Sequence, residues 1–186
     1  SKWQDLLLSV VRGIGTIQHS IGEEPTPEVT HFLTDALFTT ITNANFNDQD
    51  ILQKVDKGIV LKKQLLQKAA SMNIHLPAYQ EVTWGGEKTD YEAEGARESV
   101  LRHENPDIRS LKELTMLGLK GMAAYYEHAA HLGEENCEII SFICRALATI
   151  SNPDADMNTL LGVVLETGKY GVDVMALLDK ANTQAY

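Results

Sequence analysis

The sequence has few of the residues on which disulfide frameworks, metal centres and membrane spans depend. Only two of its 186 residues are cysteine, Cys137 and Cys144. They lie seven positions apart, which is about 10.5 Å along a helix and too far for a disulfide bond. There is no Cys-x-x-Cys pair and no cysteine–histidine cluster with the spacing of a zinc site. No apolar run approaches the roughly 18 residues of a membrane-spanning helix, and no signal peptide precedes the first predicted helix.

Positive charge is also scarce. The chain has 16 Lys and Arg residues against 26 Asp and Glu residues, a formal net charge of −10. Nucleic-acid grooves and contacts with anionic membranes need basic patches, so the composition argues against both kinds of partner. We expect the two cysteines to be small buried apolar side chains rather than thiol ligands. Free cysteines fit a reducing, cytoplasmic location.

What the sequence does contain is an internal repeat. Residues 36–43 (ALFTTITN) resemble residues 146–152 (ALATISN), about 110 positions later and with one residue deleted. In the same register Gly13 aligns with Gly121, and residues 56–58 (DKG) align with residues 166–168 (ETG). A unit that occurs only twice predicts two compact units packed together rather than a solenoid.

The spacing of apolar residues predicts an all-α protein. These residues recur every three or four positions, as on one face of a helix, and no strand pattern competes with them. Three helices are predicted in the first unit, residues 1–74, and three in the second, residues 107–186; they cover residues 3–21, 27–41, 48–69, 107–132, 137–150 and 157–182. Thr26 with Pro27, and Asn47 or Asp48, predict helix starts, and Gly133 predicts a helix end.

Residues 75–106 differ in composition and predict an acidic connecting segment between the two units. They contain seven acids and three bases, a net charge of −4. Pro77, the Gly85–Gly86 pair and Pro106 interrupt them. One short helix is predicted near residues 89–101.

Two further expectations concern packing. The segment 137–150 is apolar almost all round and should be the most buried helix. Gly13 and Gly121 should lie where helices approach closely, because each glycine costs about 1 kcal/mol in helix propensity relative to alanine. Replacement of Gly121 by Leu should then destabilise the second unit.

The histidines are the first candidates for chemistry. His128 and His131 lie three positions apart beside Glu127, a spacing that can share a metal on one helix face. No third ligand is identifiable, and His128 continues the apolar stripe of its helix, so we prefer a core or boundary histidine. Glu28 and His31 match half of the ligand set of a di-iron bundle, but no other histidine follows a glutamate by three residues. A metal-dependent bundle enzyme that uses these five residues is one alternative.

Other catalytic patterns are weaker. The serines that stand in helical segments lack a Gly-x-Ser-x-Gly context; they are Ser9, Ser20, Ser99, Ser110 and Ser141. Gly85–Gly86 is too short for a phosphate cradle. The aromatic residues are expected in the core, including Phe32, Phe38, Tyr125, Tyr126 and Phe142. From the residues alone we would infer a soluble helical module without an assembled active site.

Three runs resemble the hybrid cluster protein family, also called the prismane protein or hydroxylamine reductase. They are residues 40–46 (TITNANF), 119–133 (LKGMAAYYEHAAHLG) and 175–183 (MALLDKANT). The resemblance implies an all-α region of two three-helix bundles, and carbon monoxide dehydrogenase is similar in this part. It also implies that the whole enzyme reduces hydroxylamine and nitric oxide. Such an enzyme uses a mixed iron–sulfur–oxygen cluster and a second iron–sulfur cluster near its N-terminus.

The chain departs from that family in its ligands. The family's N-terminal cysteine cluster and its ligand-bearing α/β domains have no counterpart in residues 1–186, and neither Cys137 nor Cys144 matches a ligand position. We therefore expect no catalytic, cofactor-binding or metal-binding residue here. The expected role is a helical domain, inactive alone, that supports the cluster-containing domains.

The expected partners are the remaining domains of the parent enzyme. We also expect exposed apolar surface that favours self-association. The other alternative is an autonomous helical module that binds a partner protein.

Overall fold

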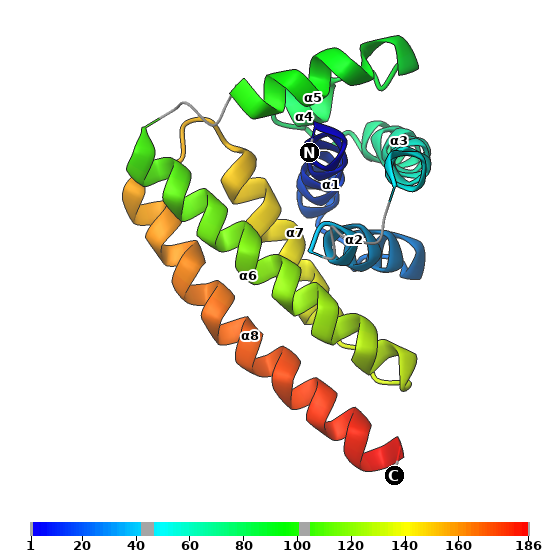
Figure 1. Cartoon of the computed structure of the whole chain (residues 1–186), viewed down its shortest axis with the longest axis vertical. Helices are drawn as coiled ribbons and strands as arrows, with labels where there is room; N and C mark the ends of the chain where they lie inside the picture. The colour runs from blue at the N-terminus through cyan, green and yellow to red at the C-terminus, as the bar shows by residue number, and fades with distance from the viewer. Residues whose placement is uncertain (1, 42–46, 101–104, 186) are drawn as a thin grey trace.

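The computed structural model describes residues 2–41, 47–100 and 105–185, and all regular structure within them is helical (Figure 1). The all-α class is therefore confirmed. The α-helices are α1 (Lys2–Ile21), α2 (Pro27–Thr39), α3 (Asp48–Ser71), α4 (Gln80–Thr83), α5 (Tyr91–Val100), α6 (Pro106–His131), α7 (Cys137–Ser151) and α8 (Met157–Ala185). A 3-10 turn at Lys88–Asp90 precedes α5. Within these ranges no helix combines the length and apolarity that a bilayer crossing requires.

Local sequence sets the helix boundaries. Thr26 caps α2, and its hydroxyl accepts a hydrogen bond of 3.2 Å from the amide of Val29. Asn47 caps α3 in the same way, with its side-chain oxygen 2.9 Å from the amide of Asp50. After α6 the chain turns at Gly133, which adopts a left-handed φ of 96°. These three boundary predictions are confirmed.

The helices form two groups that cross each other. In Figure 1, α6 and α8 run in the same direction along the long axis of the molecule, and α7 runs back in the opposite direction. α1 and α3 are seen nearly end-on in the same view. α1 packs against both α3 and α7, and α2 packs against α6. One apolar core therefore runs through both groups.

α1, and not α7, is the most enclosed of the long helices. Fourteen of the 20 residues of α1 are buried, compared with nine of the 15 residues of α7. The expectation for residues 137–150 is wrong because α1 has neighbours on several sides, including α3, α5 and α7. On α7, Glu138 and Ser141 face solvent.

The connecting segment is packed against the first group of helices. α4 and α5 both contact α1, and the hydroxyl of Tyr91 donates a 2.6 Å hydrogen bond to Asp56 of α3. α5 corresponds to the predicted short helix, whose predicted last residue, 101, lies outside the described residues. α4 is a single turn and was not predicted. The boundaries 1–74, 75–106 and 107–186, like the repeat relationship, stay predictions.

The buried face of α6 is only partly the predicted one. The predicted stripe includes Leu114, Leu117 and Tyr125, which are 52%, 65% and 46% exposed. Met122 of the predicted stripe is buried, and Ile108 and Leu111 pack against the core. The other buried residues lie outside the predicted stripe and are Thr115, Leu119, Ala123, Tyr126 and Ala129. The predicted stripe combined residues from the buried and the exposed side because apolar residues occur on both sides of α6. Periodicity alone cannot tell which of two apolar stripes meets the core.

The repeat mates Gly13 and Gly121 occupy different environments. A Cβ atom on Gly13 would collide with the backbone carbonyl of Glu81, whereas a Cβ atom on Gly121 would meet no described atom within 4 Å. The expectation that Gly121 marks a close helix approach is therefore wrong. In the second group that role belongs to Gly118, where a Cβ atom would lie 2.6 Å from Cγ2 of Thr167.

We predict opposite effects of alanine at the two repeat mates. Gly121→Ala should leave the free energy of unfolding unchanged or raise it by up to about 1 kcal/mol, because alanine favours the helix and meets no neighbour. Gly13→Ala should lower it by about 1–3 kcal/mol, because the obstructing atom belongs to the backbone and must shift. Urea unfolding followed by far-UV circular dichroism measures both. Equal effects at the two positions would contradict the placement of these glycines.

Candidate functional site

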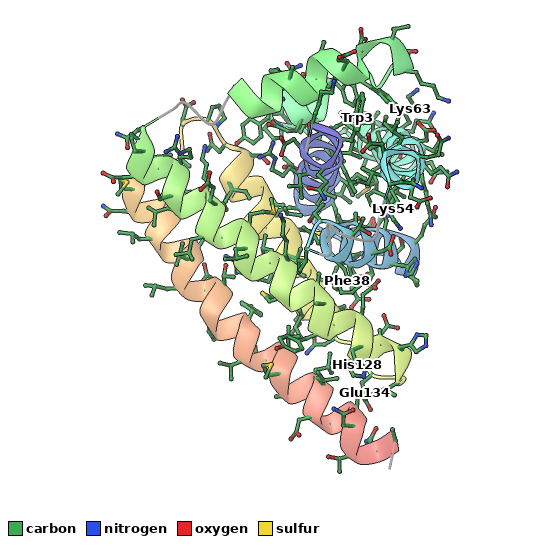
Figure 2. The ribbon with its side chains drawn as sticks, in the orientation of Figure 1. Trp3, Phe38, Lys54, Lys63, His128 and Glu134 are labelled. Atoms are coloured by element: carbon green, nitrogen blue, oxygen red, sulfur yellow. The ribbon has the colours of Figure 1, made fainter. Side chains whose placement is uncertain are left out.

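The residues that the sequence offers as metal ligands do not converge. His128 and His131 are both exposed, and Figure 2 shows His128 near the C-terminal end of α6. Glu28 on α2 is exposed as well. In the part of the chain that the structure describes, no group of three or more His, Cys, Asp or Glu side chains is arranged to hold a metal ion. The preferred interpretation of His128 as a core or boundary histidine is wrong, because its side of α6 faces solvent.

One pair from this set does meet, between α2 and α6. Oε1 of Glu127 accepts a 3.1 Å hydrogen bond from the hydroxyl of Thr34 and lies 3.9 Å from Nδ1 of His31. Burial raises the pKa of Glu127, and the hydrogen bond from Thr34 offsets part of that rise. Next to it, Nζ of Lys54 on α3 lies 2.6 Å from Oδ2 of Asp35. These contacts join three helices and do not resemble a ligand set.

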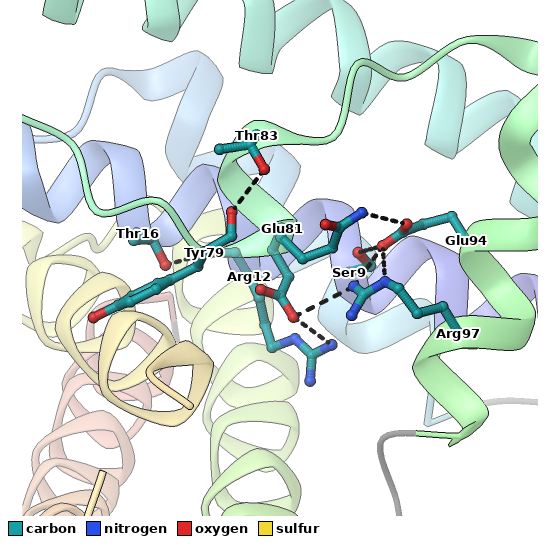
Figure 3. Close-up of polar contacts among 9 residues, drawn as sticks. Ser9, Arg12, Thr16, Tyr79, Glu81, Thr83, Glu94 and Arg97 are labelled. Atoms are coloured by element: carbon teal, nitrogen blue, oxygen red, sulfur yellow. Dashed lines mark hydrogen bonds and ion pairs between the residues drawn. The ribbon is translucent and has the colours of Figure 1, made fainter. Parts of the chain in front are cut away.

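A cluster of charged residues is buried where α4 and α5 pack against α1 (Figure 3). Nη2 of Arg97 lies 2.6 Å from Oε1 of Glu94 and 3.7 Å from Oε1 of Glu81. Nη2 of Arg12 lies 3.6 Å from the same oxygen of Glu81, and the hydroxyl of Ser9 donates to Glu94 at 3.3 Å. Glu81 and Glu94 are only 6% and 3% exposed. Each buried carboxylate thus has a guanidinium partner, without which its burial would be strongly destabilising.

Lys62 of α3 adds a third cation beside this cluster. It is 2% exposed, and its Nζ donates a 2.9 Å hydrogen bond to the carbonyl of Trp84. Burial lowers the pKa of Lys62 to about 8, although Glu94 and Glu81 act in the opposite direction. Burial also lowers the pKa of Arg12. The cluster is therefore an internal anchor that holds the connecting segment to α1 and α3.

Sequence reasoning misses this anchor because it predicts only that residues 75–106 connect the two units, without a packing partner for their acids. The sequences of α1 and α3, which the segment covers, nevertheless contain a pattern that indicates the anchor. Four polar residues of α1 recur at helical spacing beside its apolar stripe, namely Asp5, Ser9, Arg12 and Thr16. Lys62 falls in line with Val55, Gly58, Leu65 and Ala69 of α3. Polar residues at such positions predict a buried polar face.

A cleft of about 620 Å³ lies next to the anchor, between the two groups of helices. Five Lys and Arg residues and three Asp and Glu residues line it, so it is positively charged in a chain that is negative overall. Ser151 is buried at this cleft, and its Oγ has no hydrogen-bond partner among the described residues. The charge of the cleft suits an anionic group better than a metal cation.

A second cleft of about 630 Å³ contains both cysteines. Cys137 is exposed, and its Sγ donates a 2.9 Å hydrogen bond to Glu24, which raises the pKa of the thiol. Cys144 is buried, and burial raises its pKa to about 12. The prediction of buried cysteines is confirmed for Cys144 and wrong for Cys137. Two thiols, one exposed and one buried, are fewer than the about four thiolates that hold an iron–sulfur cluster.

Comparison with known protein families assigns the chain to one family. The family model described as the Prismane/CO dehydrogenase family matches residues 1–186. The chain belongs to the Prismane/CO dehydrogenase family. The resemblance inferred from residues 40–46, 119–133 and 175–183 is thereby confirmed, and the anchor and both clefts are features of a prismane-family chain.

Similar members of the prismane family carry the name hydroxylamine reductase. The protein of Bacteroides fragilis (strain YCH46) is 46% identical over 185 residues, which cover 98% of this chain and 33% of the relative. The protein of Clostridium novyi (strain NT) is 43% identical over 188 residues, covering 98% and 34%. The protein of Porphyromonas gingivalis (strain W83) is 41% identical over 186 residues, which cover 98% of this chain and 34% of the relative. The chain thus spans about a third of the length of these relatives.

Lys62→Met should change the pH dependence of stability above about pH 8. The pKa of Lys62 is about 8 in the folded chain and 10.5 in its ordinary environment. Between these values the unfolded chain binds more protons, so Lys62 makes the wild type gain stability as the pH rises through this window. The variant lacks that gain. Urea unfolding at pH values below, within and above the window measures the difference between the two proteins, and a pH-independent difference would mean that Lys62 is solvated.

Glu127→Gln should show the opposite trend at acidic pH. The pKa of Glu127 is raised above its ordinary value of 4.5 in the folded chain. The stability that Glu127 contributes is complete below pH 4.5. It is lost as the pH rises through the pKa that Glu127 has in the folded chain. Relative to the wild type, the variant should therefore gain stability between about pH 4 and neutrality. Urea unfolding across this pH range measures the difference between the two proteins, and a difference that does not change with pH would contradict a raised pKa of Glu127.

Proposed function

We propose that this chain is the helical part of a hydroxylamine reductase of the hybrid cluster type, and that it supports the cluster-containing domains without holding a cluster. The observation that carries the proposal is the alignment of 98% of the chain with one third of proteins named hydroxylamine reductase, at 41–46% identity. The substrates of the whole enzyme would be hydroxylamine and nitric oxide. Its hybrid iron–sulfur–oxygen cluster and second iron–sulfur cluster would lie outside residues 1–186, in a cytoplasmic protein.

The contribution of this chain would be a rigid, water-excluding wall. Its core is continuous across both groups of helices, and the anchor of Arg12, Glu81, Glu94, Arg97 and Lys62 holds the connecting segment in place. The potential of an iron–sulfur cluster depends on its exposure to solvent and on hydrogen bonds from the surrounding protein. A domain without ligands can therefore affect the redox chemistry of its neighbours.

The two alternatives differ in their consequences. A metal-dependent bundle enzyme requires Glu28, His31, Glu127, His128 and His131 to meet. The structure brings His31 and Glu127 to 3.9 Å, and no three such side chains gather among the residues that it describes. An autonomous binding module would function with no reductase domain joined to it. The proposed function instead requires that the chain works only as part of a longer protein.

A hybrid protein tests this requirement. The third of the Bacteroides fragilis hydroxylamine reductase that aligns with this chain is replaced by the chain itself, giving the hybrid reductase. We expect the hybrid reductase to bind iron and to reduce hydroxylamine, because a chain that is 46% identical over the whole replaced region should adopt the same fold. The same reductase with that third deleted is the control and should lose both properties.

The isolated chain completes the test. It should bind no stoichiometric iron and show no visible absorption of an iron–sulfur cluster. A folded hybrid reductase without activity would contradict the proposed role. Stoichiometric iron in the isolated chain would contradict the claim that the chain holds no cluster.

A further inference from the structure

Eight large apolar side chains on α6 and α8 are exposed, and their exposed fractions run from 40% to 75%. They are Leu114, Leu117 and Tyr125 on α6, and Met157, Leu161, Leu165, Val172 and Met175 on α8. On each helix they recur at intervals of three, four, seven or eight residues, so they form one stripe along the helix. Of the other large apolar side chains that the structure describes, only Ile41, Val60 and Met72 reach comparable exposure.

The two stripes lie on the same side of the second group of helices. Glu166 and Tyr170 of α8 pair with side chains of α7, and Tyr126 of α6 contacts the N-cap of α7. At helical periodicity the exposed residues of both helices fall on the side opposite these contacts, with Leu117 at the edge of the surface, where it also lines the cleft of about 620 Å³. α6 and α8 run side by side (Figure 1) and touch where Gly118 meets Thr167. The stripes therefore form one surface across both helices, which we call the α6–α8 face.

The α6–α8 face is uncharged along its middle. The stripe position between Leu117 and Tyr125 is Gly121, and the one between Leu165 and Val172 is Gly168. A Cβ atom at either glycine would meet no described atom within 4 Å, so packing within the described chain does not require glycine there. A glycine on an apolar helix face allows another backbone to approach closely. Contiguous apolar surface of this kind is typical of a contact surface.

We propose that the α6–α8 face is the surface that contacts the remaining two-thirds of a family-length protein. This inference rests on the proposed function. The relatives are about three times as long as this chain, so about two thirds of each relative lies outside the aligned region and is available to cover such a face. The face is the largest concentration of exposed apolar side chains on the described surface. Its lack of charge matches an apolar domain interface, and the net charge of −10 opposes an anionic lipid surface as the occupant.

Cysteine labelling tests the contact directly. Leu117→Cys and Leu165→Cys, each in a Cys137→Ser background that removes the exposed native thiol, are prepared in the isolated chain and in the hybrid reductase. Val60→Cys is the matched control, because Val60 is 58% exposed and lies on α3, outside the face. The rate of maleimide modification at each position is measured by peptide mass spectrometry. Circular dichroism of the isolated variants checks that these exposed substitutions leave the helices intact.

We expect the two face cysteines to react at least tenfold more slowly in the hybrid reductase than in the isolated chain, and Val60→Cys to react equally in both. Equal rates at the face positions would overturn the proposal. The proposal would also be overturned if the labelling rate at the face positions fell as the concentration of the isolated chain rose and was no lower in the hybrid reductase. That result would mean that a second copy of the chain covers the face. Labelling does not require turnover. An inactive hybrid reductase with protected face cysteines would therefore contradict the proposed function and leave the contact surface standing.

Discussion

The close approach of α1 to α7 is the constraint from which the rest of the structure follows. A Cβ atom on Gly15 would lie 2.6 Å from Cδ1 of Leu147, so the two helices can lie this close only because residue 15 has no side chain. This contact places a helix of the first group against the second, and it makes one core out of two groups. It also leaves α1 enclosed on several sides, with polar as well as apolar residues inside.

The enclosure of α1 explains why the acidic connecting segment is part of the fold. Buried polar groups need partners, and an unpaired buried charge is strongly destabilising. Ser9 and Arg12 on the polar side of α1 meet Glu94 and Glu81, which come from α5 and α4. The hydroxyl of Thr16 donates a 2.7 Å hydrogen bond to the backbone carbonyl of Arg12. The negative charge of residues 75–106 thus neutralises cations inside the protein as well as facing solvent.

α8 presents the opposite situation to α1. Only five of its 29 residues are buried, and they form a narrow stripe that covers the second group. A second apolar stripe faces outward and joins that of α6. A helix with two apolar stripes is suited to lie between two layers of protein. The proposed contact with the rest of a family-length protein accounts for the outward stripe, which the interior of this chain does not require.

The sequence by itself determined the helices, several of their boundaries and the family. Thr26, Asn47 and Gly133 act on their own neighbours along the chain, so their effects can be predicted from short stretches of sequence. Tertiary structure alone decided which apolar side of α6 is buried and why Gly13 but not Gly121 must be glycine. It also decided that the acids of the connecting segment meet α1. Each of these depends on a neighbour distant in the sequence, and helical periodicity describes one helix without saying what packs against it.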